Sequence, residues 1–269
     1  MNTNKTNSAQ LEPSLEEDVL ATLSREQDPA FAARLRGELR GRHARGTRNL
    51  HWFEMDLPVG RIRLVHDGAL VHLVTNHAHD FDALTDRVLG FEPAFGESKE
   101  VAQRAASVFA GRLRGSELVY LGDLPRFQQA ILRITASIPR GQVRPYGWVA
   151  RRAGSRGAVR AAGTALGHNP VPFIVPCHRV IRSDWHLGQY SAGGEDVKGS
   201  VLRWEGFEPR DLEPLAAAKV RILANPRDGT FCVPVCGPGV MDPRDYERYN
   251  SPEEAAAAGF VPCENCLPA

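Results

Sequence analysis

Prolines fix the backbone just before Cys177, the first cysteine of this chain. Pro170, Pro172 and Pro176 each hold φ near one value and lack an N–H donor, and the residues between them are apolar. This pattern predicts a short, buried, extended segment that ends in a thiol. An imidazole, that of His178, follows immediately.

Cys177 and His178 have the residue types of a nucleophile and its base. A thiol attacks only as the thiolate, so it needs a nearby proton acceptor or positive charge, and His178 can accept the proton directly or through one water. Side chains of neighbouring residues on an extended chain point to opposite faces, so only a turn would bring the two groups together. On these two residues alone, an inert buried cysteine remains the alternative interpretation.

The sequence around this pair points to a specific chemistry. The segments that matter are IPRGQVRPYGWVA (138–150), RGAVRAAGTALGHNP (156–170), PCHRV (176–180) and VKGSVLRWEG (197–206). Together they resemble the active-site region of the O6-alkylguanine-DNA alkyltransferases over residues 124–206. The resemblance implies DNA repair by direct reversal: an irreversible, single-turnover transfer of an alkyl group from O6 of guanine, and from O4 of thymine, to Cys177. It implies a methylated-DNA–protein-cysteine methyltransferase that needs no cofactor for the transfer.

The resemblance also implies a role for each catalytic residue. His178 relays the thiol proton through a water and is oriented by Glu205. Asn169 fixes the turn that precedes the active-site segment. Tyr146 crowds the 3′ phosphate, helps to rotate the nucleotide out of the stack, and protonates guanine N3 as the base leaves.

The expected partner is double-stranded DNA that carries an alkylated guanine. By resemblance, a helix-turn-helix places its second helix in the minor groove, and Arg160 fills the gap that the extruded base leaves. The other residues expected at the DNA are Tyr146, Arg151, Arg156, Ala161 and Gly163. The residues expected at the guanine edge and the alkyl pocket are Pro172, Val180, Tyr190 and Ser191. Trp185 stands where the family has a small residue, and we expect it to alter the shape of that pocket.

Charge is unevenly distributed along the chain, in agreement with a polyanionic partner. The net charge is +1, but residues 124–210 hold 13 Lys and Arg against 5 Asp and Glu. Residues 211–269 hold 5 against 9. Only the central segment therefore has the charge that binding to a nucleic-acid backbone favours.

The four remaining cysteines lie near the C-terminus as two pairs: Cys232 and Cys236, then Cys263 and Cys266. Short spacing within each pair suits a tetrahedral Zn²⁺ ion with four thiolate ligands, and disulfides are the alternative. The segment resembles the metal-binding domain of the Ada adaptive-response protein. That resemblance implies methyl transfer from DNA phosphotriesters to Cys232, whereas the acidic charge of the segment favours a structural or partner-binding zinc module.

These patterns predict a chain of four parts. The parts are an N-terminal extension (1–47), partly disordered; a small α/β domain of one sheet plus helices (48–117); a mainly helical alkyltransferase domain with a helix-turn-helix (118–210); and a small zinc domain with four cysteine ligands (211–269). The role of the extension stays open, and its arginines suit a solvated helix face better than a phosphate site. His77 and His79 could form a metal pair, although two such histidines without further ligands more often bind nothing.

No stretch of about 18 apolar residues predicts a membrane span, and no apolar signal core is present near Met1. We therefore expect a monomeric, cytoplasmic protein that associates with the nucleoid when it binds DNA. Two other functions fit part of the sequence. One is a damage sensor, in which methylation of Cys177 or Cys232 controls binding to DNA or a partner. The other is a thiol hydrolase that uses Cys177, His178 and Glu205, which would not need the arginine-rich helices.

Overall fold

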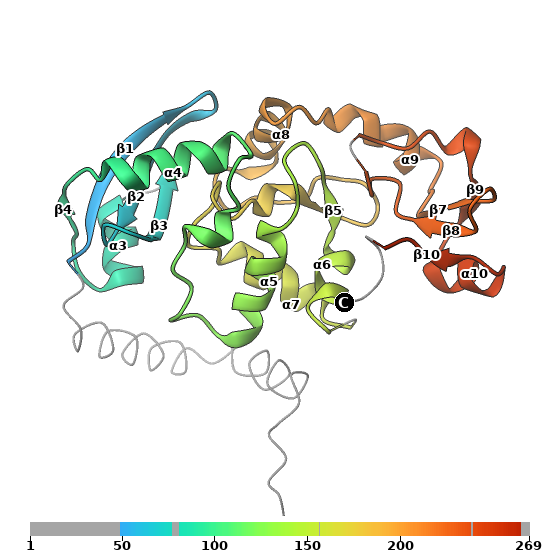
Figure 1. The fold of residues 1–269 in the computed structure, drawn as a ribbon, viewed down its shortest axis with the longest axis horizontal. Helices are drawn as coiled ribbons and strands as arrows, with labels where there is room; N and C mark the ends of the chain where they lie inside the picture. Colours follow the sequence, from blue (N-terminus) through green and yellow to red (C-terminus); the bar gives the residue numbers. More distant parts are fainter. Residues whose placement is uncertain (1–48, 77–80, 156, 238, 265–269) are drawn as a thin grey trace, which may run out of the picture.

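The computed structural model describes residues 49–76, 81–155, 157–237 and 239–264 of this 269-residue chain. Three groups of elements follow one another along the molecule: a sheet with two helices, a central helical body, and a small C-terminal sheet (Figure 1). The expected N-terminal extension and the pair His77 and His79 lie outside the described residues. Within the described ranges, no helix combines the length and apolar character that a membrane crossing requires.

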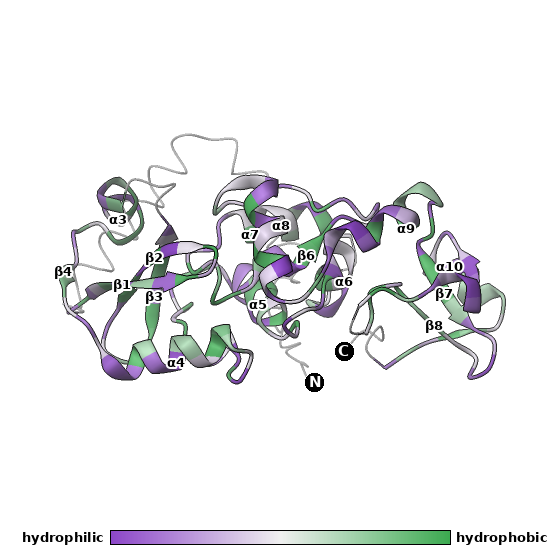
Figure 2. Cartoon of the chain, turned by 90° about the horizontal axis from the view of Figure 1, so that it is seen from above, coloured by the Kyte–Doolittle hydropathy of each residue, from purple (hydrophilic) through white to green (hydrophobic). Residues whose placement is uncertain are grey.

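The first group is a four-stranded sheet in the order β3-β2-β1-β4. Its elements are β1 (His51–Leu57), β2 (Gly60–His66), β3 (Val71–Asn76), α3 (Phe81–Leu89), β4 (Ala94–Phe95) and α4 (Lys99–Phe109). Alternate residues of β1 face opposite sides: Trp52 packs against Phe81 of α3, and Phe53 belongs to the core that includes Val101 of α4. Accordingly, α3 and α4 lie on opposite faces of the sheet in both views (Figures 1 and 2).

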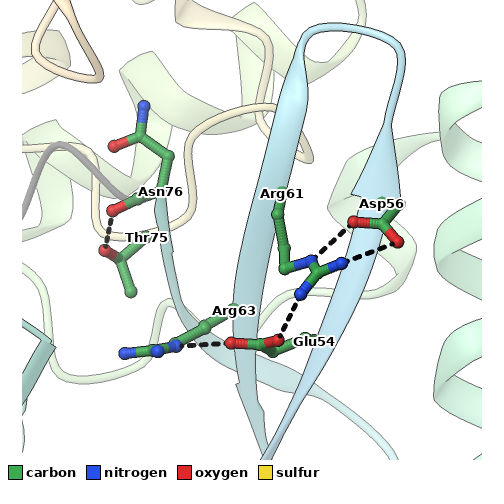
Figure 3. Close-up of polar contacts among 6 residues, drawn as sticks. All are labelled: Glu54, Asp56, Arg61, Arg63, Thr75 and Asn76. Carbon is green, nitrogen blue, oxygen red and sulfur yellow. Dashed lines mark hydrogen bonds and ion pairs between the residues drawn. The ribbon is translucent and has the colours of Figure 1, made fainter.

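Charged side chains occupy solvent-exposed positions of the β1–β2 hairpin (Figure 3). Arg61 contacts both Asp56 and Glu54, and Glu54 also accepts a hydrogen bond from Arg63 at 3.0 Å. On β3, the side chain of Asn76 donates to the carbonyl of Ala192 at 2.6 Å. The N-terminal sheet is thereby joined to the loop that precedes α8, which borders the candidate site described below.

The central body is mainly helical. Its elements are η1 (Gly115–Glu117), α5 (Arg126–Ala136), β5 (Arg144–Pro145), α6 (Tyr146–Arg152), α7 (Val159–Gly167), η2 (Cys177–Arg179), β6 (Val180–Ile181) and α8 (Gly194–Trp204). The apolar residues of α5 lie three and four apart, and Ile131 and Leu132 are fully buried. Strands β5 and β6 pair in parallel, with Arg144 opposite Val180. This pair of strands links the start of α6 to the residues that directly follow η2, the short helix that begins at Cys177.

A second four-stranded sheet, in the order β10-β8-β7-β9, forms the C-terminal end of the structure. The elements after α8 are η3 (Pro209–Leu212), α9 (Glu213–Ala217), β7 (Ile222–Asn225), β8 (Thr230–Cys232), η4 (Pro243–Asp245), β9 (Glu247–Tyr249), α10 (Pro252–Ala257) and β10 (Val261–Pro262). We refer to the described residues from 218 onward as the C-terminal module. Val143, Ile181 and Leu202 of the central body share one hydrophobic core with residues of this module such as Val235.

The prediction of an extended segment before Cys177 is wrong, because residues 171–175 form a turn. The N–H of Val175 donates to the carbonyl of Val171 at 2.9 Å, and Phe173 has a φ of 68°. The amide of Asn169 donates to the Val175 carbonyl, and its oxygen accepts from the Val171 N–H. These bonds satisfy the backbone within the turn, so no neighbouring strand is needed.

Candidate active site and metal centre

Cys177 lies at the first position of the short helix η2 and is 5% exposed. A cavity of about 320 Å³ opens onto it. The lining residues come from α6, α7, η2 and the loop before α8: Tyr146, Gly163, Leu166, Gly167, Cys177, Gln189, Tyr190 and Ser191. The thiol therefore stands in the wall of a recess, and two glycines of α7, Gly163 and Gly167, form part of the same wall.

Asn169 holds this thiol and the turn before it. Its side-chain amide donates to Sγ of Cys177 at 3.2 Å and to the carbonyl of Val175 at 2.9 Å. Its oxygen accepts from the N–H of Val171 at 3.1 Å. One buried side chain thus fixes both ends of the turn and orients the sulfur.

His178 is buried, and one of its ring nitrogens is hydrogen-bonded to the carboxylate of Glu205. Its Nε2 lies 3.0 Å from Oε1 of Glu205, while Nδ1 has no hydrogen-bond partner among the described residues. When Nε2 carries the proton that Glu205 accepts, Nδ1 keeps its lone pair and can take a proton. Cys177 and His178 both belong to η2, but only Cys177 lines the cavity, and the His178 ring lies behind it, 6.0 Å from the ring centroid of the lining residue Tyr190.

Glu205, which follows α8, also binds Arg179. The guanidinium donates from Nε to Oε2 at 2.8 Å and from Nη2 to Oε1 at 2.7 Å, and Nη1 donates to the carbonyl of Ile138. Such a two-point pair fixes the carboxylate more firmly than a single bond does. Arg179 is thus a site residue that the sequence did not single out, although it belongs to the motif around Cys177.

Burial and charge set the protonation states of these groups. Burial raises the pKa of the Cys177 thiol, and the Asn169 hydrogen bond and the charge of Lys198 oppose that rise only in part. Burial lowers the pKa of His178 by more than Glu205 raises it. Burial alone would raise the pKa of Glu205, but His178 and Arg179 outweigh it and lower that pKa to about 2. At neutral pH the resting site therefore holds a neutral thiol, a neutral imidazole and a carboxylate.

Lys198 is a second residue that the sequence did not single out. It is fully buried, and its Nζ donates to the carbonyls of Val180 and Leu187 at 2.7 and 2.6 Å. The ammonium also lies 5.9 Å from the ring centroid of Tyr146. Burial lowers the pKa of Lys198 to about 8, against the opposing effect of Cys177. A buried lysine within a helix pattern has no distinctive sequence signal, which is why only the structure identifies it.

The other predicted residues divide into three groups. Tyr146, Gly163, Tyr190 and Ser191 line the cavity, and burial raises the pKa of Tyr146, so its hydroxyl stays protonated. Pro172 and Val180 are buried but do not belong to that lining. Of the DNA-binding candidates on α6 and α7, Arg160 is exposed, Arg151 is half-buried and Ala161 is buried; Arg156 lies outside the described residues.

Trp185 does not shape the cavity, contrary to the prediction. It is 4% exposed and belongs to the core that the central body shares with the C-terminal module. Its indole Nε1 donates to the carbonyl of Val220. A large side chain is accommodated at this position because the module covers it.

Three thiols of the C-terminal module converge. The Sγ atoms of Cys232, Cys236 and Cys263 all lie within 4.8 Å of one another, and those of Cys236 and Cys263 are 3.5 Å apart. Zn–S bonds of about 2.3 Å in tetrahedral geometry place sulfurs just under 4 Å apart, so this donor set fits zinc. Cys266, the expected fourth ligand, lies outside the described residues.

Comparison with known proteins finds matches to the two parts of the chain that contain these residues. Residues 126–207 match the family model for the DNA-binding domain of 6-O-methylguanine DNA methyltransferase, and residues 203–269 match the model for the metal-binding domain of Ada. A methylated-DNA–protein-cysteine methyltransferase of Mycobacterium leprae is 34% identical over 158 residues, which cover 58% of this chain and 92% of that protein. The relative with that name from Mycobacterium tuberculosis is 31% identical over 164 residues, or 61% of this chain and 97% of that protein.

A solved structure, that of Mycobacterium tuberculosis OGT in complex with DNA, covers 58% of this chain and 93% of its own, with 31% identity and a TM-score of 0.49. The sequence relatives define the class, that of proteins which accept alkyl groups from DNA on a cysteine. The chain belongs to the methylated-DNA–protein-cysteine methyltransferase family.

Replacing Asn169 tests the role of the turn. We expect Asn169→Ala to lower the free energy of unfolding by about 1–3 kcal/mol, because a buried N–H and a buried carbonyl lose their partner. It should also slow alkyl transfer to Cys177, whose sulfur is no longer held. Urea denaturation and single-turnover kinetics measure the two effects. Gln129→Ala is the matched control, since Gln129 also donates to a backbone carbonyl, that of Leu124, but away from the cavity. Equal transfer rates in the Asn169→Ala and parent proteins would contradict the positioning role.

Proposed function

We propose that this protein repairs alkylated DNA by moving the alkyl group from O6 of guanine, or O4 of thymine, onto the sulfur of Cys177, once per molecule. The observation that carries the proposal is a buried thiol in the cavity wall, followed in the same short helix by a neutral histidine whose Nδ1 has no partner among the described residues and whose Nε2 is held by a carboxylate. The family to which the chain belongs supports the same reaction.

The reaction balances with the groups at hand. The sulfur attacks the alkyl carbon, an S–C bond forms, and the C–O6 bond breaks in an in-line displacement. The thiol proton passes, through a water, to Nδ1 of His178, and Glu205 stabilises the resulting imidazolium. Tyr146 donates a proton to N3, so that guanine leaves as the neutral base, and the proton taken up by His178 returns through solvent to the Tyr146 hydroxyl. Nothing at the site cleaves the thioether back to the thiol, which makes the protein a stoichiometric acceptor.

The duplex must deliver the base into the cavity, because the O6 alkyl group is inaccessible within the stack. We assign duplex binding to α6 and α7, with α7 as the second helix of a helix-turn-helix that enters the minor groove. We assign the exposed side chain of Arg160 to the gap that the base leaves, and Gly163 lies beside Tyr146 in the lining of the cavity. The excess of basic residues between 124 and 210 supports binding to the phosphate backbone of DNA.

For the C-terminal module we propose a structural Zn²⁺ bound by Cys232, Cys236, Cys263 and Cys266. Zinc bound there supplies a cross-link that a segment of this size needs to fold. A monomer that works in the cytoplasm, on the nucleoid, fits this set of roles. The damage-sensor hypothesis gains no specific support from the described residues, and the thiol-hydrolase hypothesis leaves the arginines of α6 and α7 without a use.

Stoichiometry tests the proposed function. A duplex with one O6-methylguanine is incubated with increasing amounts of protein, and the nucleosides are separated after digestion. We expect O6-methylguanine to disappear and guanine to appear in equal amount, with the yield limited to one per chain. Repeated turnover, or persistence of the lesion despite tight binding, would contradict the proposal.

Arg160 offers a test of base extrusion. We expect Arg160→Ala to slow transfer from the duplex about 10–100-fold, because the cost of unstacking, a few kcal/mol, is no longer offset. Transfer from free O6-benzylguanine, which needs no extrusion, should stay unchanged. Arg203→Ala, at the exposed end of α8, is the control. An equal loss on duplex and free base would mean that Arg160 acts in the cavity instead.

A further inference from the structure

One buried arginine of the central body is bound to the loop between two of the metal-ligand cysteines. Arg144 is 4% exposed. Its Nη1 donates to the carbonyl of Val235, and its Nη2 to the carbonyl of Cys236, each at 2.7 Å. The same two nitrogens bind the Val143 carbonyl and Oε1 of Gln142 within the central body. The guanidinium therefore bridges the two parts of the molecule.

Arg144 is also close in sequence and structure to the candidate active site. It is the first residue of β5, and Tyr146, which lines the cavity, is only two residues further on. Strand β5 pairs with β6, where Val180 stands opposite Arg144 and directly follows η2, the helix that begins with Cys177. Figure 1 shows β5 on the side of the helical body that is nearer to β7 and β8.

The surrounding interface is packed. Val143, which precedes β5, and Ile181 of β6 lie in one core with Phe231, Val235 and Cys236 of the module. A shift of the loop that carries Val235 and Cys236 would either leave a buried guanidinium without acceptors, which is costly, or move β5 with it. Two other contacts, from Trp185 to Val220 and from Arg221 to Ser183, join the same two parts but involve neither β5 nor β6.

We propose that Arg144 is a positioning residue for alkyl transfer, which couples the cysteine-rich metal site to the Cys177 cavity. Metal binding by Cys232, Cys236 and Cys263 fixes the loop whose carbonyls Arg144 binds, and the loop in turn fixes β5, Tyr146 and the strand after Cys177. The inference rests on the proposed function. It makes the C-terminal module part of the transfer machinery and not an independent appendage.

The first test uses the full chain without substitution. The protein is stripped of metal under reducing conditions, its zinc content is checked by elemental analysis, and single-turnover methyl transfer is measured with and without Zn²⁺. We expect about tenfold slower transfer in the metal-free protein, a coupling of ordinary size. Equal rates in the two states would overturn the coupling while leaving the proposed function intact. Absence of transfer in both states would instead contradict the proposed function.

The second test needs no activity. Coupling is reciprocal for binding, so a duplex that seats O6-methylguanine in the cavity must change the affinity for Zn²⁺. In the Cys177→Ser background, which does not consume the lesion, we expect the damaged duplex to tighten Zn²⁺ binding about tenfold in competition with a chromogenic chelator. Undamaged duplex, which contacts α7 but places no base against Tyr146, should leave the affinity for Zn²⁺ unchanged. No difference between the two duplexes would overturn the proposal.

Substitutions of Arg144 then distinguish a positioning role in alkyl transfer from a purely structural role. We expect Arg144→Gln to transfer slowly even with Zn²⁺ bound and to lose both the metal dependence and the duplex effect on Zn²⁺ affinity. Arg144→Lys keeps the charge and can reach one carbonyl. It should therefore recover part of the transfer rate, of the metal dependence and of the duplex effect on Zn²⁺ affinity. Arg221→Gln removes the comparable contact to Ser183 and should behave as the parent. A full metal dependence in Arg144→Gln would overturn the role of Arg144.

Discussion

Cys177→Ser is expected to abolish alkyl transfer while leaving the binding of lesion-containing duplex within about twofold of the parent. The hydroxyl is a much weaker nucleophile than the thiolate, and neither His178 nor Lys198 can make up that difference. Serine is close in size to cysteine, and the amide of Asn169 that now bonds Sγ at 3.2 Å can bond the hydroxyl instead. The fold should therefore persist, with a change in the free energy of unfolding below about 1 kcal/mol.

Gel-shift binding and loss of O6-methylguanine, followed on the same sample, measure the two properties. Residual transfer by Cys177→Ser at more than a few per cent of the parent yield would contradict the assignment of the acceptor. Loss of duplex binding together with transfer would mean that the substitution disturbed the cavity, and Cys177→Ala would then be compared.

Glu205→Gln should have the second-largest effect, on the rate and on its pH dependence. The amide can still accept from Nε2 of His178 but cannot stabilise an imidazolium, so we expect transfer to slow about 100-fold or more. In the parent, protonation of His178 stops the relay. Because burial places the pKa of His178 below its ordinary value, transfer should fall only at pH values below about 6.5. Glu205 raises the pKa of His178, so its removal should move this loss to still lower pH.

Stability must be followed in the same variant. Glu205 is the partner of the buried guanidinium of Arg179, and removing one member of such a pair costs about 3–5 kcal/mol. Single-turnover rates are therefore compared under conditions where circular dichroism shows both proteins folded. Glu208→Gln, three residues away and exposed, is the control. An unchanged pH profile in Glu205→Gln would contradict the relay through His178.

Much of this site could be predicted from the sequence because it depends on motifs and on residues close in the chain. The prolines before Cys177, the adjacent His178 and the WEG segment around Glu205 pointed to one cavity, and the structure brings His178 and Glu205 into contact. Apolar residues at helical spacing, Phe127, Ile131 and Ile134, predict the helix that the structure shows as α5. The predicted resemblance to the alkyltransferases is confirmed by the relatives.

What the sequence did not reveal depends on one unusual backbone conformation and on contacts between distant residues. The turn at residues 171–175 needs a positive φ at Phe173, which no pattern assigns to a phenylalanine. Arg144 binds carbonyls about ninety residues further along the chain, and carbonyls carry no sequence signal. Trp185 was expected at the pocket, but its side chain packs in the core that the central body shares with the C-terminal module. Backbone acceptors and packing between modules are the properties that local patterns leave undetermined.

The central claim is that the sulfur of Cys177 receives the alkyl group. The full chain is incubated with a duplex that contains a single O6-methylguanine, and intact mass is followed by peptide mapping. We predict one methyl increment per chain, located on the peptide that contains Cys177 and absent after incubation with undamaged duplex. A methyl group found only on the peptides of Cys232, Cys236, Cys263 or Cys266, or no increment despite tight binding to the lesion, would contradict the account.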